Sequence, residues 1–416
     1  MPDASPTAPR QTKRFEQKRE AILDAAAKRF NERGIRGTSL ADVSSGVGLM
    51  TNSITYYYRR KEDLAAACFL AKIGWLDALI GEAEGAGPPE ARLRTFLDLY
   101  CRGLAAMATG ERPALIRFHD VRALPSPQAE TVFAAYNGFF RRMRALCLEA
   151  DAVPDLDRVA RNTRTHLLVS VVQTMRVWID RYEPNDYPRV GARVADLLLR
   201  GLAGPASPWP PARALAVPPQ ETAALETAPG DAFLRAATIL INEQGYRGAS
   251  VEKISAHLRV TKGSFYHHND NKDDLVAHCF ARTFDRIRRA QDAADAAGGT
   301  GWERITAATG TLVRHQLSES GPLLRWIAVG ALPEGLRADV TRTMQRLWER
   351  VAFPIADGIA DGSIRPCDPS MAAQVVNSAI DAASELDRWA RDIDGAAAQA
   401  NYVFPLFAGL YAPPPR

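Results

Sequence analysis

The chain contains an internal repeat. Residues 22–69 align without a gap with residues 233–280 at a constant offset of 211, and 17 of the 48 positions are identical. Ordinary composition gives roughly one match in fifteen, so chance does not explain the similarity. A unit of this length is a folded module rather than a short motif. Two copies in one chain predict a molecule that does alone what a symmetric dimer does with two chains.

Charge constrains the partner only locally. The formal net charge is +4, which is too small to require nucleic acid as a partner, so a local cluster has to carry that argument. One such cluster lies near the start of the chain, where a single Glu16 opposes Arg10, Lys13, Arg14, Lys18 and Arg19. This segment is either an arm that reaches phosphates or a solvated tail.

Cysteine usage and hydropathy indicate the compartment. The five cysteines are scattered and show no CxxC spacing, which argues for a reducing environment and against a disulfide framework or a zinc site. The first twenty residues are polar and unlike a secretory signal peptide. No apolar run approaches the roughly 20 residues that span a bilayer. We therefore expect a soluble, cytoplasmic protein.

A proline-rich linker separates two helical halves. Seven prolines lie between Gly204 and Gly230, and this density excludes helix and favours an extended connector. Elsewhere apolar residues recur at helical spacing, as in the stretch that ends at Gly34 and in its copy that ends at Gly245. Each half thus reads as a small module followed by a larger helical one. The predicted domains are a flexible basic arm (1–14), a first small module (15–68), a first larger module (69–203), the linker (204–229), a second small module (230–279) and a second larger module (280–412).

Each small module shows a helix-turn-helix pattern. Ser39 precedes a short helix expected over residues 40–47 and forms a capping box with Asp42 in place of glutamate. Gly48 provides a turn residue that accepts left-handed dihedral angles, and a second short helix is expected over residues 51–58. In the other copy Ser250 precedes residues 251–258, and the second helix is expected over residues 261–268.

The second short helix of each pair carries hydrogen-bonding side chains of the right reach for base edges and phosphates. One apolar residue, Ile54 or Phe265, is expected to anchor each helix to its core. Such helices enter the major groove, where each base pair shows a distinct donor and acceptor pattern. Two lysines follow the helices at a position suited to phosphate neutralisation. The predicted DNA-binding residues are Ser39, Thr51, Asn52, Ser53, Thr55, Tyr56, Tyr57, Lys61, Ser250, Thr261, Lys262, Gly263, Ser264, Tyr266, His267, His268 and Lys272.

On these residues the chain resembles the TetR family of transcriptional regulators. The run from Val260 to His268, followed by Lys272-Asp273-Asp274-Leu275, is close to the family's recognition segment, and residues 49–58 with Lys61-Glu62-Asp63-Leu64 match it more loosely. The resemblance covers about 48 residues of each half. It implies a three-helix DNA-binding domain followed by a larger ligand-binding and dimerisation domain in each unit, and a regulator, usually a repressor, that a small-molecule effector releases from its operator. Activation is the alternative mode.

Departures from the family pattern differ between the copies. Arg259 occupies the usual turn-glycine position and Asn269 replaces an aromatic residue, whereas in the first copy Met50 lies at the expected cap and Thr55 replaces a tyrosine. The two copies would therefore read different bases, and we expect a double-stranded operator that is asymmetric or an imperfect palindrome. The alternative is a ligand-sensing or protein-interaction module in which one copy has lost DNA binding.

The resemblance also implies that the last two long helices of each larger module pair with those of a partner. The candidates are residues 155–182 with 188–202, and 369–392 with 396–410. The expected contact stripes are Val159, Thr163, Leu167, Val171 and Trp178, and Val375, Ala379, Ala383 and Leu386. Exposed stripes of this kind would associate. We therefore predict an all-α fold in which the two halves pair within one chain as an intramolecular pseudo-dimer. Two chains with four DNA-binding modules are the alternative.

The sequence gives weaker indications of an effector site and none of catalysis. Tyr100, Arg117, Phe118, His119, Tyr136 and Trp326 are candidates for an effector pocket, whose aromatic rings and cations would suit a planar apolar or acidic molecule. No HExxH spacing and no phosphate-binding glycine loop occurs in the sequence. His267-His268 with Asp270 could suggest a metal site, but adjacent helical residues diverge by about 100° and would rarely chelate one ion. We expect no enzyme activity, no cofactor and no membrane partner.

Overall fold

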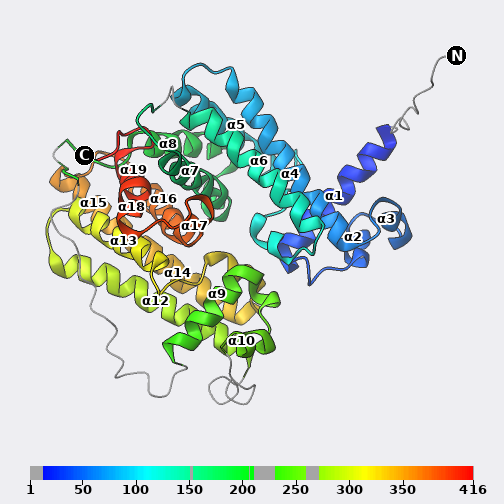
Figure 1. Cartoon of the computed structure of the whole chain (residues 1–416). Helices are drawn as coiled ribbons and strands as arrows, with labels where there is room; N and C mark the ends of the chain where they lie inside the picture. Colours follow the sequence, from blue (N-terminus) through cyan, green and yellow to red (C-terminus); the bar gives the residue numbers. More distant parts are fainter. Residues whose placement is uncertain (1–12, 150–152, 206, 210–229, 259–270, 416) are drawn as a thin grey trace.

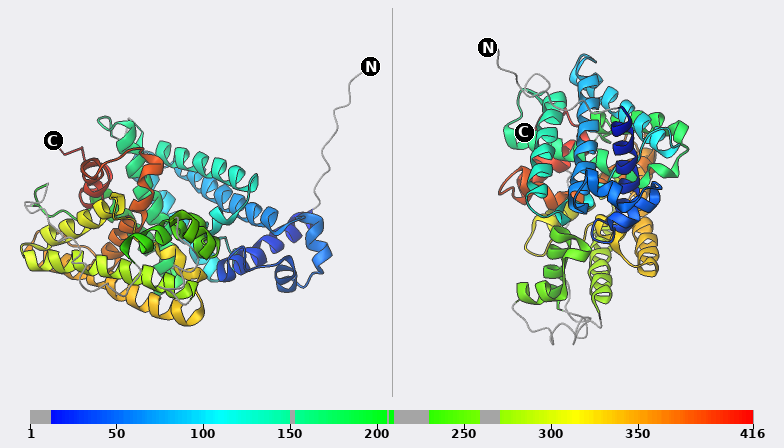
Figure 2. Two further views of the ribbon diagram at one scale, coloured as in Figure 1. Left: turned by 60° about the horizontal axis from the view of Figure 1, so that its bottom comes forward. Right: turned by 90° about the vertical axis from the view of Figure 1, so that its right-hand side faces the viewer.

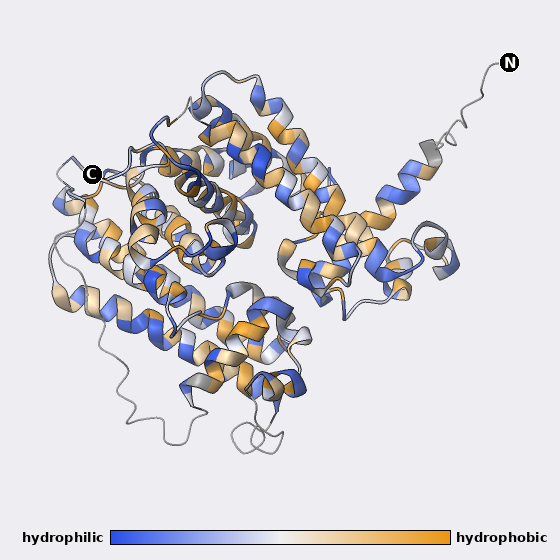
Figure 3. Cartoon of the chain, in the orientation of Figure 1, coloured by the Kyte–Doolittle hydropathy of each residue, from blue (hydrophilic) through white to orange (hydrophobic). Residues whose placement is uncertain are grey.

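The computed structural model describes residues 13–149, 153–205, 207–209, 230–258 and 271–415. This part of the chain is helical and contains no strand, apart from one isolated bridge between Ala203 and Ile364. The two halves lie side by side (Figure 1). Most helices carry both apolar and polar residues (Figure 3), and buried apolar residues from both halves belong to one hydrophobic core. The predicted all-α fold of two units is therefore confirmed.

The described residues of the first half form eight α-helices and three short 3₁₀ helices. Their bounds are α1 Lys13–Arg33, α2 Leu40–Gly46, α3 Thr51–Tyr57, α4 Lys61–Glu84, α5 Pro89–Ala108, η1 Phe118–Ala123, α6 Gln128–Leu148, α7 Arg158–Trp178, η2 Ile179–Arg181, η3 Pro184–Asp186 and α8 Tyr187–Arg200. Helices α1 to α3 form the small module. Helices α4 to α8 form the larger one, and α4 connects the two (Figure 1).

The second half repeats this order with more interruptions. Its described elements are α9 Asp231–Gly248, α10 Val251–Leu258, α12 Lys272–Ala297, α13 Gly301–Leu317, η5 Trp326–Ala331, α14 Glu334–Arg350, α15 Ala352–Asp361, α16 Pro369–Ala382, η6 Ala383–Glu385, α17 Leu386–Trp389, α18 Gly395–Ala398, η7 Gln399–Val403 and α19 Phe404–Ala408. Helix α16 begins at the position that matches the start of α7 under the 211-residue offset. Trp178 ends the long α7, whereas its counterpart Trp389 ends the short α17, because a 3₁₀ turn interrupts the second copy at Ala383.

Helix α4 corrects one expectation from the sequence. It is long and apolar enough by composition to cross a membrane, so an apolar run of that length does exist. Most of that window is buried inside the protein, where α4 packs against α1, α5 and α6. Leu64, Phe69 and Ile80 are fully buried on it, so the burial of α4 accounts for its apolar composition.

The two halves pack against each other through the predicted helices. Helix α7 packs on α16 and η7, and α8 packs on α16 and α19. Thr163, Leu167 and Val171 are fully buried, as are Ala379 and Ala383. Val159 is an exception at 39% exposure, because it lies near the start of α7 and the buried face begins one residue later, at Ala160. The interface of α7 and α8 with α16, η7 and α19 is called the seam below. Burial of its two apolar stripes makes the largest favourable contribution to the free energy of association of the halves.

Polar contacts fix the register of this seam. Thr163 Oγ1 donates to the Asn401 carbonyl at 2.9 Å, and Thr174 Oγ1 donates to Ser378 Oγ at 2.6 Å. Arg164, which is fully buried, donates from Nη1 to the carbonyls of Leu410 and Ala412, both at 2.7 Å. Each of these bonds joins one half to the other, and a slip of one residue along α7 would leave buried polar atoms without partners.

The ends of the last helices cross at two glycines. Leu202 N donates to the Phe407 carbonyl at 2.7 Å, and Leu410 N donates to the Leu198 carbonyl at 2.8 Å. Gly201 and Gly409 both have positive φ, at 63° and 102°. A Cβ on Gly201 would lie 2.1 Å from the Phe407 oxygen, so only glycine permits this close backbone approach.

Candidate nucleic-acid interface

The geometry of the first helix-turn-helix follows from its caps. Ser39 Oγ accepts from Asp42 N at 3.2 Å, and Ser39 N donates back to Asp42 Oδ2 at 2.8 Å, so the predicted capping box is present. Ser39 Oγ also donates to Asp42 Oδ2 at 2.6 Å, and this bond together with that from Ser39 N lowers the pKa of Asp42. Gly48 adopts φ 64°, the left-handed turn expected for it. Helix α3 then begins without a side-chain cap at Met50.

Helix α3 is anchored on one face and open on the other. Ile54 is fully buried against the core of the small module, as predicted. Thr51, Asn52, Thr55 and Tyr56 are exposed, and Tyr56 is 78% exposed. The open face therefore carries hydroxyl and amide groups around a single apolar anchor. Helix α3 lies at the outer edge of the small module (Figure 1).

The remaining predicted residues of α3 also have local contacts. Ser53 is half-buried, and Thr51 Oγ1 lies 3.1 Å from Ser44 Oγ of α2. The Tyr57 ring lies 4.7 Å from that of Phe15, which joins the end of α3 to α1. Tyr58, which follows α3, accepts from Arg19 Nε at 3.2 Å. Its burial raises the pKa of the Tyr58 hydroxyl, so this group stays protonated near neutral pH. Contacts from α1 and α2 thus hold α3 in place.

Lys61 and Lys272 have equivalent places in the two halves. Lys61 Nζ donates to the carbonyls of Arg36 and Thr38 at 3.3 and 3.2 Å, and Lys272 Nζ donates to the Tyr246 carbonyl. The Lys61 ammonium group joins the start of α4 to the turn after α1, and the Lys272 ammonium group joins the start of α12 to the last turn of α9. This contact was not anticipated from the sequence, which suggested phosphate binding alone. It places a cation beside the turn that leads into the helix-turn-helix.

The second small module is described in part. The helical dihedral angles of α9 are interrupted by a kink at Gly245, which has φ 71°. Ser250 Oγ then accepts from Lys253 N at 3.3 Å at the start of α10, whose bounds match the prediction. Predicted residues Thr261, Lys262, Gly263, Ser264, Tyr266, His267 and His268, and the departures Arg259 and Asn269, lie outside the described residues.

The two small modules lie next to each other. Atoms of the Arg36 guanidinium lie 3.7 Å from where a Cβ would stand on Gly248, so the turn after α1 approaches the end of α9. Helix α9 also packs on η1 of the first half, and α1 packs on η5 of the second. Figure 2 shows the same arrangement from two other sides. The modules are therefore held at one side of the paired halves rather than at opposite ends.

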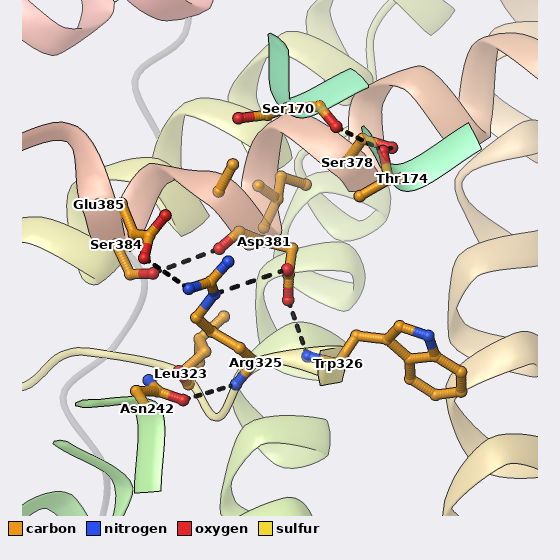
Figure 4. A network of polar contacts seen from close by, with 12 residues as sticks. Ser170, Thr174, Asn242, Leu323, Arg325, Trp326, Ser378, Asp381, Ser384 and Glu385 are labelled. Atoms are coloured by element: carbon orange, nitrogen blue, oxygen red, sulfur yellow. Dashed lines mark hydrogen bonds and ion pairs between the residues drawn. The ribbon is translucent and has the colours of Figure 1, made fainter. Parts of the chain in front are cut away.

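A repeated asparagine clamp joins each small module to its larger module. Asn31 Nδ2 donates to the Leu115 carbonyl at 3.0 Å, and its Oδ1 accepts from Arg117 N at 2.8 Å. Asn242 makes the same pair of bonds, to the Leu323 carbonyl at 2.9 Å and from Arg325 N at 3.0 Å (Figure 4). The repeat marked both asparagines as shared residues, but their function became visible only from their contacts.

Comparison with known proteins identifies the modules. Residues 22–68 and 233–279 both match the family described as bacterial regulatory proteins, tetR family. Each small module is therefore a TetR-type module, and the chain has two of them in tandem. Both matches fall on the small modules, whose first helices are α1 and α9.

The curated relatives match mainly over these modules. The chain is 44% identical over 48 residues to the Transposon Tn10 TetC protein of Escherichia coli, which is 12% of this chain and 24% of that protein. It is 26% identical over 134 residues to the HTH-type transcriptional repressor KstR2 of Rhodococcus jostii, which is 32% of this chain and 64% of that protein. The chain therefore spans about a quarter of the first relative and just under two thirds of the second.

Solved structures of the family align with about half of the chain. The regulator PfmR from Thermus thermophilus covers 46% of this chain and 97% of its own, at 22% identity and a TM-score of 0.36. AibR in complex with isovaleryl coenzyme A and operator DNA covers 43% of this chain and 97% of its own, at 21% identity and a TM-score of 0.35.

The six candidates for an effector pocket do not form one site. Phe118 and Tyr136 line a cavity of about 100 Å³ between the TetR-type modules. Tyr100 is buried in ring contacts with Trp75 and Phe96, whereas Arg117 is exposed. Trp326 packs against Trp348, with ring centres 4.9 Å apart. His119 lies in η1, and its side chain is outside the described set.

An ion-pair cluster across the two halves was missed from the sequence. Glu385 Oε1 accepts from Arg122 Nη2 at 2.6 Å and from Arg325 Nη1 at 2.7 Å (Figure 4 shows the second contact). Burial raises the pKa of Glu385, but the two guanidinium groups outweigh it and lower this pKa to about 2. Arg122 Nη1 also donates to the Asn242 carbonyl at 2.9 Å. The repeat gave no signal for this cluster, because the counterpart of Glu385 in the first half is Thr174.

A buried lysine was also missed. Lys72 of α4 is 3% exposed, and its Nζ lies 4.0 Å from the centre of the Phe118 ring. Burial lowers the pKa of Lys72 well below its ordinary value, and the charges of Arg176 and Arg117 lower it further. Within the described residues, no group of three or more His, Cys, Asp or Glu side chains is arranged to hold a metal ion.

Proposed function

We propose that the chain is a sequence-specific transcriptional regulator that binds a double-stranded DNA operator through both TetR-type modules. The exposed polar face of α3 carries this proposal. Asn52, Thr55 and Tyr56 are open to solvent, whereas Ile54 fixes the helix to its core. An anchored helix with this open face suits direct reading of base edges in the major groove.

The unit that binds the operator is a single chain. The buried seam between α7 and α16, and the crossing at Gly201 and Gly409, support a covalent pseudo-dimer that is monomeric in solution. Both modules lie on one side of that seam. Two TetR-type modules held on one side suit successive major-groove faces, which lie about 34–36 Å apart.

The operator has unlike half-sites. Under the repeat alignment, Asn52, Thr55 and Tyr56 of the first module correspond to Gly263, Tyr266 and His267 of the second. Side chains that differ in donors, acceptors and length select different bases. The operator is therefore asymmetric or an imperfect palindrome rather than a strict inverted repeat.

A small-molecule effector controls the affinity for DNA, and repression is the default mode. The Asn31 and Asn242 clamps connect each TetR-type module to the segment before η1 or η5, so a shift of that segment changes the spacing of the modules. An effector that favours an unsuitable spacing lowers DNA affinity. By linkage, DNA lowers the affinity for the effector by the same factor.

Selection of bound sequences from a random DNA library tests this function. We expect one consensus with two unlike half-sites, bound by one chain, as sedimentation of the complex would show. A strict inverted repeat would refute the asymmetry, and a chain that sediments only as a dimer would refute the single-chain unit. A consensus with a single half-site would instead favour a molecule in which one module no longer reads DNA.

The salt dependence of operator affinity tests the contact with phosphate. Lys61→Ala should reduce the slope of log affinity against log salt by about one unit. Arg346→Ala on α14 is the matched control, since this exposed arginine lies in the larger module. Circular dichroism checks that the loss of the Lys61 contacts to Arg36 and Thr38 leaves the fold intact. An unchanged slope would remove Lys61 from the phosphate contacts.

A further inference from the structure

The cavity between the TetR-type modules belongs to both halves. Asn31 and Gly34 line it from the end of α1, and Asn242 and Gly245 line it from α9. Its remaining walls come from η1, α6 and α7 of the first half and from η5, η6 and α17 of the second. A molecule in this cavity would contact both DNA-binding modules and both larger modules at once.

Aromatic rings form much of the cavity wall. Phe118 and Tyr136 lie edge to face with ring centres 5.1 Å apart, and the Trp389 ring lies 6.1 Å from that of Tyr136. Phe133 also lines the cavity. A volume of about 100 Å³ is of the order that one aromatic ring occupies in a protein cavity. The shape and the rings therefore favour a planar molecule with a single ring.

The charged groups of the wall favour an anion. The cavity is lined by three guanidinium groups and one carboxylate. Arg122 and Arg325 share Glu385, and Arg325 also pairs with Asp381 at 3.9 Å, whereas Arg388 has no ion pair among the described residues. The Arg388 guanidinium instead lies over the rings of Phe133, Tyr136 and Trp389, at 5.0, 5.8 and 5.1 Å. Its fork of N–H donors matches a carboxylate in two parallel hydrogen bonds.

An open groove gives access to the cavity. The groove has a volume of about 610 Å³ and shares six lining residues with the cavity, namely Arg122, Phe133, Asn242, Arg325, Glu385 and Arg388. The cluster of Arg122, Glu385 and Arg325 thus lies between the groove and the cavity. Arg388 is exposed at this boundary, where it can meet an anion that arrives from solvent.

We propose that this cavity is a single effector site per chain and binds a small aromatic carboxylic acid, whose ring lies among Phe118, Tyr136 and Trp389 and whose carboxylate pairs with Arg388. The inference rests on the proposed function in treating the ligand as the effector, whereas the binding site stands on the cavity alone. On Arg388 the bound carboxylate adds a second negative charge to the cavity wall and competes with Glu385 for Arg122, so it loosens the contact of Arg122 with Glu385 and with the Asn242 carbonyl. One molecule therefore acts on both TetR-type modules.

Calorimetric titration of the full-length chain without DNA tests the site. The probes are benzoate, salicylate and phenylacetate, with the neutral benzamide as the matched uncharged compound. We expect at least one acid to bind at one site per chain, and benzamide to bind at least about tenfold more weakly than benzoate. Arg388→Gln should weaken binding of the acid at least about tenfold, whereas Arg391→Gln, at an exposed arginine on the same half, should leave it unchanged.

Several results would overturn the proposal. One is the absence of binding by any of the three acids up to about 10 mM, and another is binding at two equivalent sites per chain. Equal affinity for benzamide and benzoate would also refute it. So would an Arg388→Gln chain that is folded by circular dichroism and binds the acid as well as the wild type does. Operator binding is measured separately. A chain that binds the acid but no DNA would refute the regulatory function and support the acid-binding site. A chain that binds DNA but no acid would refute the acid-binding site and leave the regulatory function supported.

Discussion

Replacement of Glu385 by glutamine should weaken the connection between the two halves. The carboxylate accepts from Arg122 of the first half and Arg325 of the second, and its pKa lies at about 2, compared with an ordinary value of 4.5. This pKa difference corresponds to an upper bound on the order of 3 kcal/mol. The side chain is 23% exposed, so solvent screens part of the interaction, and we expect a loss of about 1–2 kcal/mol at neutral pH.

The pH dependence gives this prediction a distinct signature. Because the pKa of Glu385 is lower in the folded than in the unfolded chain, its stabilisation is complete above about pH 4.5 and disappears as the pH falls toward about 2. The difference in stability between the wild type and Glu385→Gln should therefore shrink over this interval. Urea unfolding followed by circular dichroism at a series of pH values measures it. Glu349→Gln on α14 is the control, since Glu349 has no ion pair within the described part of the chain. A difference that stays constant with pH, or an equal loss in the control, would refute the reasoning.

Three further predictions concern the seam, the Asn31 clamp and the exposed face of α3. Gly201→Ala should lower stability by about 1–3 kcal/mol, because its Cβ would meet the Phe407 carbonyl at 2.1 Å, whereas Gly85→Ala, with open space around it, should be neutral in the same thermal unfolding experiment. Asn31→Ala should speed amide hydrogen exchange in α1 and abolish the effector response while DNA binding persists; unchanged exchange would contradict the clamp. Tyr56→Phe should weaken operator binding several-fold in fluorescence anisotropy without changing the unfolding midpoint, since only an exposed hydroxyl is lost.

Local structure was predictable where a short stretch of sequence determines it. The helix expected over residues 40–47 is α2 Leu40–Gly46, and that expected over 51–58 is α3 Thr51–Tyr57. The capping box and the positive φ of Gly48 depend on neighbouring residues alone. The burial of the apolar stripes on α7 and α16 was predictable for a different reason, because long apolar stripes need a partner surface.

The cavity and its ion pairs were not predictable, because they depend on tertiary packing. Arg122 and Glu385 are 263 positions apart, and no spacing rule relates them. Tyr100 and Arg117 looked like equally good pocket residues in the sequence, yet one is in the core and the other is exposed. Composition indicates which groups are available to a ligand, whereas only the packing of helices decides which of them meet.

Fusion of the two units explains why the cluster exists in one copy. In a symmetric dimer of identical chains, a residue at the Glu385 position would occur twice, and both copies would have to fit the same contacts. Here Thr174 occupies the equivalent place and bonds to Ser378 across the seam, while Glu385 holds two arginines. The same difference appears at the clamps, where Arg117 is exposed but Arg325 is half-buried and ion-paired. Once each half has its own sequence, one central effector site can replace two equivalent effector sites. The second short helix of each helix-turn-helix can then also change independently to recognise its own half-site. The asymmetric operator and the single effector site are therefore expected together, and a strict palindrome with two effectors per chain would contradict both.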